Sequence, residues 1–172
     1  MRYVRIFLQC VGALALLLLV AMATYILVYI YAPEQTRIKD KNQAVFILNW
    51  AGMNPSQNWN IIDSSISKRT FTGDHADYAC IQLEDATVNL PTLNGWQSGP
   101  ETNEFFAKAL ENAITWAKTE NAECFPSFDL ANSAEMKIMF WKVTAHDRSP
   151  TAAEVLLLHV PTKRLFYASF KT

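Results

Sequence analysis

The chain has 172 residues, with 15 Lys and Arg against 16 Asp and Glu and a formal net charge of −1. This length suits a single domain of ordinary size, and the near-neutral charge argues against a nucleic-acid-binding protein, which normally carries a basic face. Hydrophobic residues make up 51% of the chain. They gather near the N-terminus, a distribution that excludes a polytopic membrane protein, a disordered chain and a small disulfide-stapled scaffold.

An apolar segment opens the chain: residues 6–32 contain 24 hydrophobic residues out of 27 and no charged side chain. A helix needs about 20 apolar residues to cross a hydrocarbon core, so we expect this segment to form a single transmembrane helix in the lipid bilayer. The alternative is a cleavable signal peptide, for which Ala21-Met22-Ala23 offers a small-x-small site. The sequence stays apolar as far as Ala32, however, and this length favours an uncleaved anchor.

The charges beside the apolar segment predict its orientation. Arg2 and Arg5 precede it without a nearby acid, whereas the other flank mixes acidic and basic residues. By the positive-inside rule, residues 1–5 are then a cytoplasmic tail. Residues 33–43 form a linker and residues 44–172 a periplasmic domain, which places the protein in a bacterial inner membrane.

Two cysteines, Cys80 and Cys124, lie outside the apolar segment. An even pair in an exported domain predicts a disulfide, because that compartment is oxidising. Two unpaired buried thiols are the alternative. A redox role is disfavoured, since the sequence has no Cys-x-x-Cys motif.

The first elements expected in the domain are short. Residues 44–50 form a short apolar run, and its periodicity does not distinguish a strand from a buried helix. A loop follows over residues 52–60, which are rich in Asn and also contain Gly and Pro. Residues 65–72 and 77–83 are both compatible with β-strands, and the turn residues 73–76 between them predict a hairpin.

The clearest element is an amphipathic helix. Ser98-Gly99-Pro100-Glu101 forms a capping box with Pro in the first turn. Apolar residues then recur at helical spacing from Phe105 to Ala117, which predicts a helix that ends near Asn121.

Three apolar runs close the chain, over residues 137–144, 154–160 and 165–170. Their short connections predict an antiparallel three-strand meander. The expected fold is therefore α+β, with one main helix packed on an antiparallel sheet of four or five strands. The last strand ends the chain and offers a contact route if it forms an edge of the sheet.

The best candidate for chemistry is the turn that holds Asp74, His75 and Asp77. Two carboxylates and an imidazole could ligate a divalent cation or place a general base, with His146 folded nearby. The alternative is plain turn chemistry, which favours Asp and Gly for backbone reasons. Dedicated zinc or calcium spacing is missing, so neither a metal nor a cofactor is predicted.

Tryptophan is frequent, with five residues in the chain. Trp116 and Trp141 lie in amphipathic elements and are expected in the core. Trp59 and Trp96 lie in polar loop sequences, where exposed rings often contact a partner. The alternative is that these two rings fold back over the edge of the core.

These patterns favour a membrane-anchored periplasmic domain that binds an envelope protein, as an accessory or as an inhibitor or immunity-type partner, without catalysis. The retained anchor, the lack of catalytic spacing and the loop tryptophans support this hypothesis. The alternative is an anchored hydrolase or metal-dependent enzyme that uses the turn of Asp74, His75 and Asp77.

Overall fold

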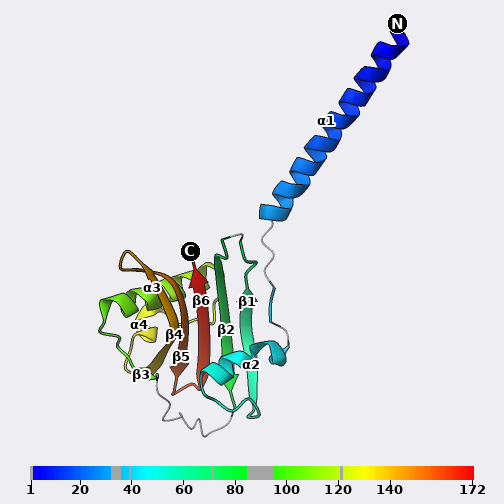
Figure 1. Cartoon of the computed structure of the whole chain (residues 1–172). Coiled ribbons are helices and arrows are strands. Elements are labelled where there is room, and N and C mark those ends of the chain that lie inside the picture. Colours follow the sequence, from blue (N-terminus) through cyan, green and yellow to red (C-terminus); the bar gives the residue numbers. More distant parts are fainter. Residues whose placement is uncertain (1, 32–35, 39, 71, 85–94, 121) are drawn as a thin grey trace. The chain divides into compact units, whose positions relative to one another are not determined.

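The computed structural model describes residues 2–31, 36–38, 40–70, 72–84, 95–120 and 122–172. The chain divides into two compact units, residues 1–34 and 35–172. The first unit holds one continuous helix, α1 (Arg2–Tyr31) (Figure 1). Over the described residues, no helix combines the length and the apolar character needed to cross a membrane. The transmembrane helix expected over residues 6–32 is therefore not confirmed.

The second unit is an α+β domain, as expected, and its sheet has six strands in the order β1-β2-β6-β5-β4-β3. Every neighbouring pair of strands is antiparallel. The elements of this unit are α2 (Lys41–Trp50), β1 (Trp59–Ile66), β2 (His75–Leu83), β3 (Gln97–Ser98), α3 (Glu104–Thr119), α4 (Phe128–Ala131), β4 (Met136–His146), β5 (Ser149–His159) and β6 (Arg164–Lys171).

The C-terminal meander of β4, β5 and β6 is confirmed, but its last strand is not an edge. Instead, β6 lies in the middle of the sheet between β2 and β5. Six of its eight residues are buried, because an interior strand is covered on both faces and paired on both sides. The edges of the sheet are β1 and the short β3.

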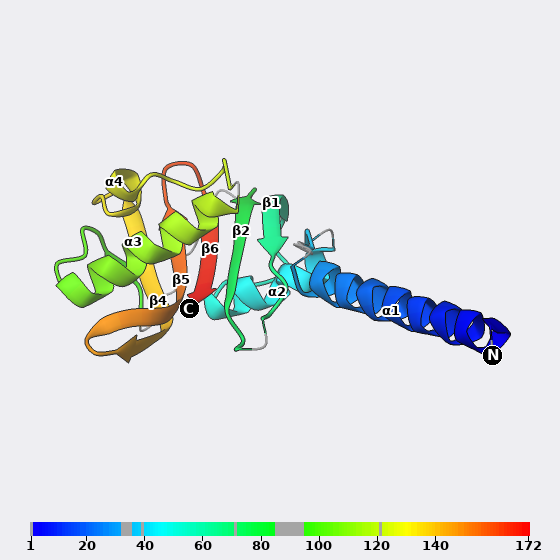
Figure 2. The same cartoon turned by 90° about the horizontal axis from the view of Figure 1, so that it is seen from above.

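The helices α3 and α4 cover one face of the sheet, and α2 covers the other (Figure 2). On the first face, α3 buries Leu110 and Ile114 against Leu157 of β5 and Phe166 of β6. Successive residues of a strand point to opposite faces. The neighbouring residues in these strands therefore pack with α2 on the second face, where the core residues are Ile47, Leu48, Ile81, Leu156, Leu158, Leu165 and Tyr167.

The run over residues 44–50 proves to be helical, as part of α2. The Asp40 side chain caps this helix by accepting a hydrogen bond from the Asn42 amide at 2.9 Å. Ala44, Ile47 and Leu48 share one buried face. A helix of ten residues is too short for its period to be recognised, so packing on the sheet decides its structure.

The amphipathic helix is confirmed as α3, but it begins later than the predicted capping box. Ser98 belongs to β3, and Asn103 is the N-cap, with its side chain accepting hydrogen bonds from the Phe105 and Phe106 amides. The helix ends at Thr119. The predicted end, Asn121, lies outside the described residues.

The predicted antiparallel pairing is confirmed for β1 and β2, but the predicted bounds are wrong. β1 ends at Ile66 and so shares only residues 65–66 with the predicted strand 65–72, and β2 begins at His75, inside the predicted turn 73–76. Part of the predicted linker also belongs to this unit: Thr36 forms two backbone hydrogen bonds with Ile66, at 2.9 and 2.8 Å, and Ile38 is buried. Residues 33–35 and 39 of the linker lie outside the described residues.

The predicted pairing of Cys80 and Cys124 is confirmed, since their sulfur atoms are 2.00 Å apart, at bonding distance. Cys80 lies in β2, and Cys124 follows α3. The pair therefore joins the sheet to the end of the helix that covers it.

Candidate functional site

The sheet face toward α2 changes from apolar to polar along its strands. In β6, Leu165 and Tyr167 pack with α2, whereas Ser169 and Lys171 follow on the same face. Because antiparallel partners share a face, the residues beside them are also on this side of the sheet. Two cross-strand rows result, namely Asp77-Ser169-Glu154-Lys142 and His75-Lys171-Ala152-Thr144.

A cavity of about 290 Å³ lies over these rows. We call it the polar hollow. Its lining residues are His75, Lys142, Thr144, Thr151, Ala152, Ala153, Glu154, Ser169, Phe170 and Lys171.

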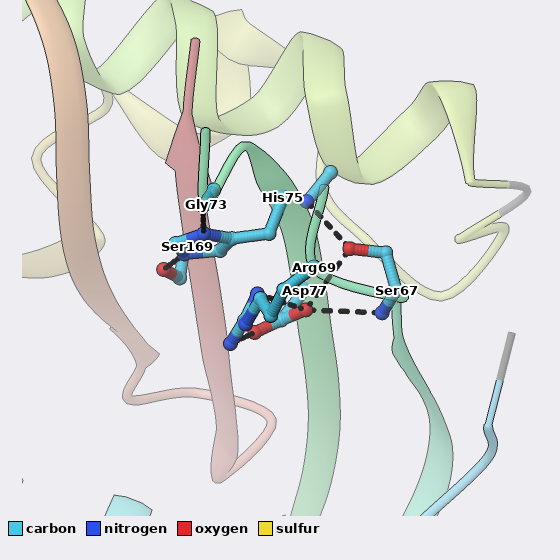
Figure 3. A network of polar contacts seen from close by, with 7 residues as sticks. Ser67, Arg69, Gly73, His75, Asp77 and Ser169 are labelled. Atoms are coloured by element: carbon cyan, nitrogen blue, oxygen red, sulfur yellow. Dashed lines mark hydrogen bonds and ion pairs between the residues drawn. The ribbon is translucent and has the colours of Figure 1, made fainter. Parts of the chain in front are cut away.

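Beside this hollow, the buried Asp77 carboxylate forms an ion pair with the exposed side chain of Arg69 (Figure 3). Its two carboxylate oxygens accept hydrogen bonds from the Arg69 guanidinium, at 3.1 and 2.6 Å. The Ser67 amide donates a third, at 3.0 Å. A bidentate contact of this kind is strong and directional. Asp77 therefore holds the strand ends together and is saturated by protein donors.

His75 is held by hydrogen bonds at both of its ring nitrogens (Figure 3). Nδ1 lies 2.9 Å from the Gly73 carbonyl oxygen, and Nε2 lies 2.9 Å from the Ser169 hydroxyl. Because a carbonyl only accepts, Nδ1 carries the proton in the neutral ring, and Nε2 accepts from the hydroxyl. The structure thus orients a base toward a hydroxyl at the wall of the hollow.

Asp74 and His146 do not belong to the lining of the polar hollow. The Asp74 carboxylate accepts a hydrogen bond from the Thr72 hydroxyl, at 2.5 Å, within the turn before β2. His146 lies at the end of β4, where its side chain is exposed and lies 3.3 Å from Asp147. Over the described residues, no three His, Cys, Asp or Glu side chains gather in a way that could hold a metal ion.

Trp59 and Trp96, the predicted contact residues, both pack on the α2 side of the sheet. Trp59 is buried and donates from Nε1 to the Pro55 carbonyl, at 3.1 Å. Trp96 is half-buried and donates from Nε1 to the Ala51 carbonyl, at 3.1 Å. Both indoles therefore stabilise loops over the core, and a contact with a partner stays a prediction.

Trp141, expected in the core, is 51% exposed. It lies at an irregularity of β4, between the paired residues Phe140 and Lys142. A bulge of this kind turns a side chain out of the regular alternation. The Trp141 ring stacks on Trp50 at the end of α2, with ring centres 5.2 Å apart and an angle of 9° between the planes.

Further rings extend this contact. Trp50 also meets Phe46 and Tyr167 edge to face, at 4.8 and 6.0 Å between ring centres. We call Phe46, Trp50, Trp141 and Tyr167 the aromatic cluster. Burial raises the pKa of the Tyr167 hydroxyl above its usual range and so favours the neutral form of this ring. Trp116, also expected in the core, is 38% exposed on α3.

Among the described residues, only part of the outer side of β4 is paired with another strand. Among the described residues, β3 pairs with β4 at Lys137 and Ile138, and the Gly99 amide bonds the Met136 carbonyl. From Met139 to His146, the described part of the chain shows no strand paired on that side. A strand edge of this kind presents backbone donors and acceptors to another chain.

Sequence reasoning identified His75 and Asp77 but missed Trp141, Lys142, Ser169 and Lys171. One signal for Trp141 was present, since Phe140 and Trp141 are adjacent in a strand and cannot both regularly face one core. The other three residues, on β4 and β6, line the same cavity as His75 only through strand pairing, which the sequence pattern does not contain.

Comparisons of the chain with protein-family models, with curated proteins and with solved structures found no match.

Proposed function

We propose that the domain binds another protein through the aromatic cluster and the open side of β4. The observation that carries this proposal is the half-exposed indole of Trp141, held by stacking on Trp50. Aromatic rings of this kind supply a large contact area at little cost in conformational entropy, and they dominate the energy of many interfaces.

The geometry favours an extended segment of the partner protein. Such a segment adds to the edge of the sheet beside Met139 to His146, with its backbone paired to β4. An apolar side chain of the segment then covers the Trp141 ring. This mode of binding suits an envelope accessory protein or an inhibitor or immunity-type protein, and neither role requires catalysis by this domain.

We further propose that residues 6–32 hold the chain in a bacterial inner membrane, with the domain on the periplasmic side. The sequence of this segment and the exposure of its side chains support this anchor. The four leucines at residues 16–19 point in successive directions around α1, and each is 60–66% exposed. A helical turn that is apolar on all sides is stabilised by apolar surroundings.

The binding proposal is tested by photo-crosslinking from single positions in the full-length protein in its cells. A crosslinking side chain at position 141 should trap one defined partner, whereas the same group at position 116 should not. Trp116 is a matched control, because it is also an exposed tryptophan but lies on α3. Equal trapping from both positions, or none from position 141, contradicts the proposal.

The anchor is tested separately, with intact spheroplasts. External protease should remove the domain, and alkaline extraction should leave the full-length chain in the membrane fraction. A chain that is released by alkali, or protected from protease until the membrane is dissolved, contradicts the proposed topology.

One observation favours the alternative, an anchored hydrolase: the hydrogen bond between His75 and Ser169 resembles a base and nucleophile pair. However, β6 pairs with strands on both sides. The amides near Ser169 are therefore engaged in the sheet rather than available to a developing oxyanion. A fluorophosphonate probe that labels the wild type but not Ser169→Ala supports the hydrolase, and an unlabelled wild type counts against it.

A further inference from the structure

The polar hollow exists because two kinds of residue meet on one sheet face. Near α2, this face carries Leu156 and Tyr167, which the helix covers. In the next two rows the residues are polar or small, and Ala152 places only a methyl group at the centre of the second row. A larger side chain at position 152 would fill the space that the hollow now offers.

Several polar groups of the hollow are already fixed in place. His75 is held by Gly73 and Ser169, as described above. The Lys171 ammonium donates to the Thr72 carbonyl, at 2.7 Å. A lysine ammonium has three donors, so this contact positions Lys171 and leaves donors for a second acceptor. Fixed donors of this kind reduce the entropy that a ligand must lose on binding.

The charge of the hollow is positive. Lys142 and Lys171 line it together with one acid, Glu154. Asp77, the other acid in these rows, is neutralised by Arg69 at 2.6 Å. By contrast, residues 33–172 as a whole carry 13 basic and 16 acidic side chains. A local excess of positive charge in an acidic domain raises the concentration of small anions at this place.

We propose that the polar hollow binds a small molecule that bears an oxyanion, a carboxylate or a phosphate. Lys142 and Lys171 supply the charge, and the hydroxyl group of Thr144 supplies a further hydrogen bond. Glu154 accepts a hydrogen bond from a hydroxyl or amino group on the same ligand. This inference goes beyond the proposed function, because it concerns a small ligand at the hollow rather than a protein at Trp141.

The experiment uses isotope-labelled full-length protein in detergent micelles, with the ionic strength held constant by sodium chloride. Inorganic phosphate and acetate are titrated separately while the NMR signals of His75, Ser169 and Lys171 are followed. At least one anion should shift these signals in a saturable manner. Saturation at a lower concentration of phosphate than of acetate indicates a phosphate site. The reverse order indicates a carboxylate site.

The decisive variant is the double substitution Lys142→Gln and Lys171→Gln, which should weaken binding by at least about tenfold. Lys108→Gln with Lys118→Gln is the matched control, because it removes the same charge from α3 on the opposite face. A second variant, Lys142→Glu alone, changes an exposed side chain and keeps the test valid if the double variant does not fold.

Shifts that do not saturate, or that both double variants reduce equally, would overturn the proposal. Trp141→Ala should retain anion binding and lose the protein partner. The two proposals therefore fail independently, since one depends on the lysines and the other on the indole.

Discussion

Tyr78 shows how one buried polar group makes stability depend on pH. It lies in β2 with 2% of its surface exposed, and its hydroxyl donates to the Asp63 carboxylate at 3.0 Å. Burial first, and then this hydrogen bond, raise the pKa of Tyr78 to about 12 from a usual value of 10.0. The folded state therefore favours the neutral form.

This shift predicts a loss of stability at alkaline pH. Below pH 10.0 the tyrosine is neutral in both the folded and unfolded states, and its contribution is fully present. Between pH 10.0 and about 12, the unfolded state loses the proton first, so the free energy of unfolding should fall. Urea denaturation of wild type and Tyr78→Phe across this range should show a shallower fall in the variant; identical slopes would contradict this assignment.

Gly99 is required for a close approach of two segments rather than for an unusual backbone angle. A Cβ atom at this position would lie 2.3 Å from the Ser133 carbonyl oxygen. Gly99→Ala should therefore lower the free energy of unfolding by about 1–3 kcal/mol, because one of the two backbones must move. Gly12→Ala is the control, since a Cβ atom there meets nothing within 4 Å apart from the neighbouring backbone of its own helix. Chemical denaturation that finds no difference between the variants would contradict this contact.

At the scale of the element, the start of α3 differs from the helix start that the sequence signature predicts. Ser98 and Glu101 match a capping box, but Ser98 pairs with Lys137 in the sheet. Asn103 caps the helix instead, at 3.0 Å from the Phe105 amide. The competing backbone pairing of β3 therefore moves the helix start toward the C-terminus.

Two alanine variants test which residue is the cap. Asn103→Ala should cost about 1 kcal/mol of the free energy of unfolding, because the first turn loses a side-chain acceptor. Ser98→Ala should change it by less than about 0.5 kcal/mol, as expected for an exposed residue. Thermal and urea denaturation would show the difference. A larger cost for Ser98→Ala than for Asn103→Ala would show that Ser98 caps the helix and would contradict this prediction.

At the scale of the whole second unit, one disulfide joins the sheet to the segment after α3. Cys80 in β2 joins Cys124 beyond α3, across a sequence separation of 44 residues. A closed loop of this length restricts the unfolded chain and stabilises the folded state by about 3–4 kcal/mol.

Removal of this link should therefore be costly for the domain as a whole. The double variant Cys80→Ala and Cys124→Ala should lower the free energy of unfolding by about 2–4 kcal/mol. Urea denaturation of wild type under reducing conditions should show a loss of the same size. A reductant that destabilises the double variant as much as the wild type would show that the effect does not come from this disulfide.

The sequence by itself determined the features that depend on local pattern. The apolar face of α3 and the meander of the last three strands follow from spacing and turn residues. The cysteine pair was predictable from cysteine number and context, and it is confirmed at 2.00 Å. Each of these signals lies within a few residues or needs no register.

Only the tertiary structure decided the strand order, and with it the candidate site. Ser169 meets His75 because β6 enters the sheet beside β2, although 94 residues separate the two. Trp141 becomes exposed because a local irregularity turns it from the core toward Trp50. Pairing between distant strands is decided by the energy of the whole packed sheet, and no periodicity in a single strand records which neighbour it will have.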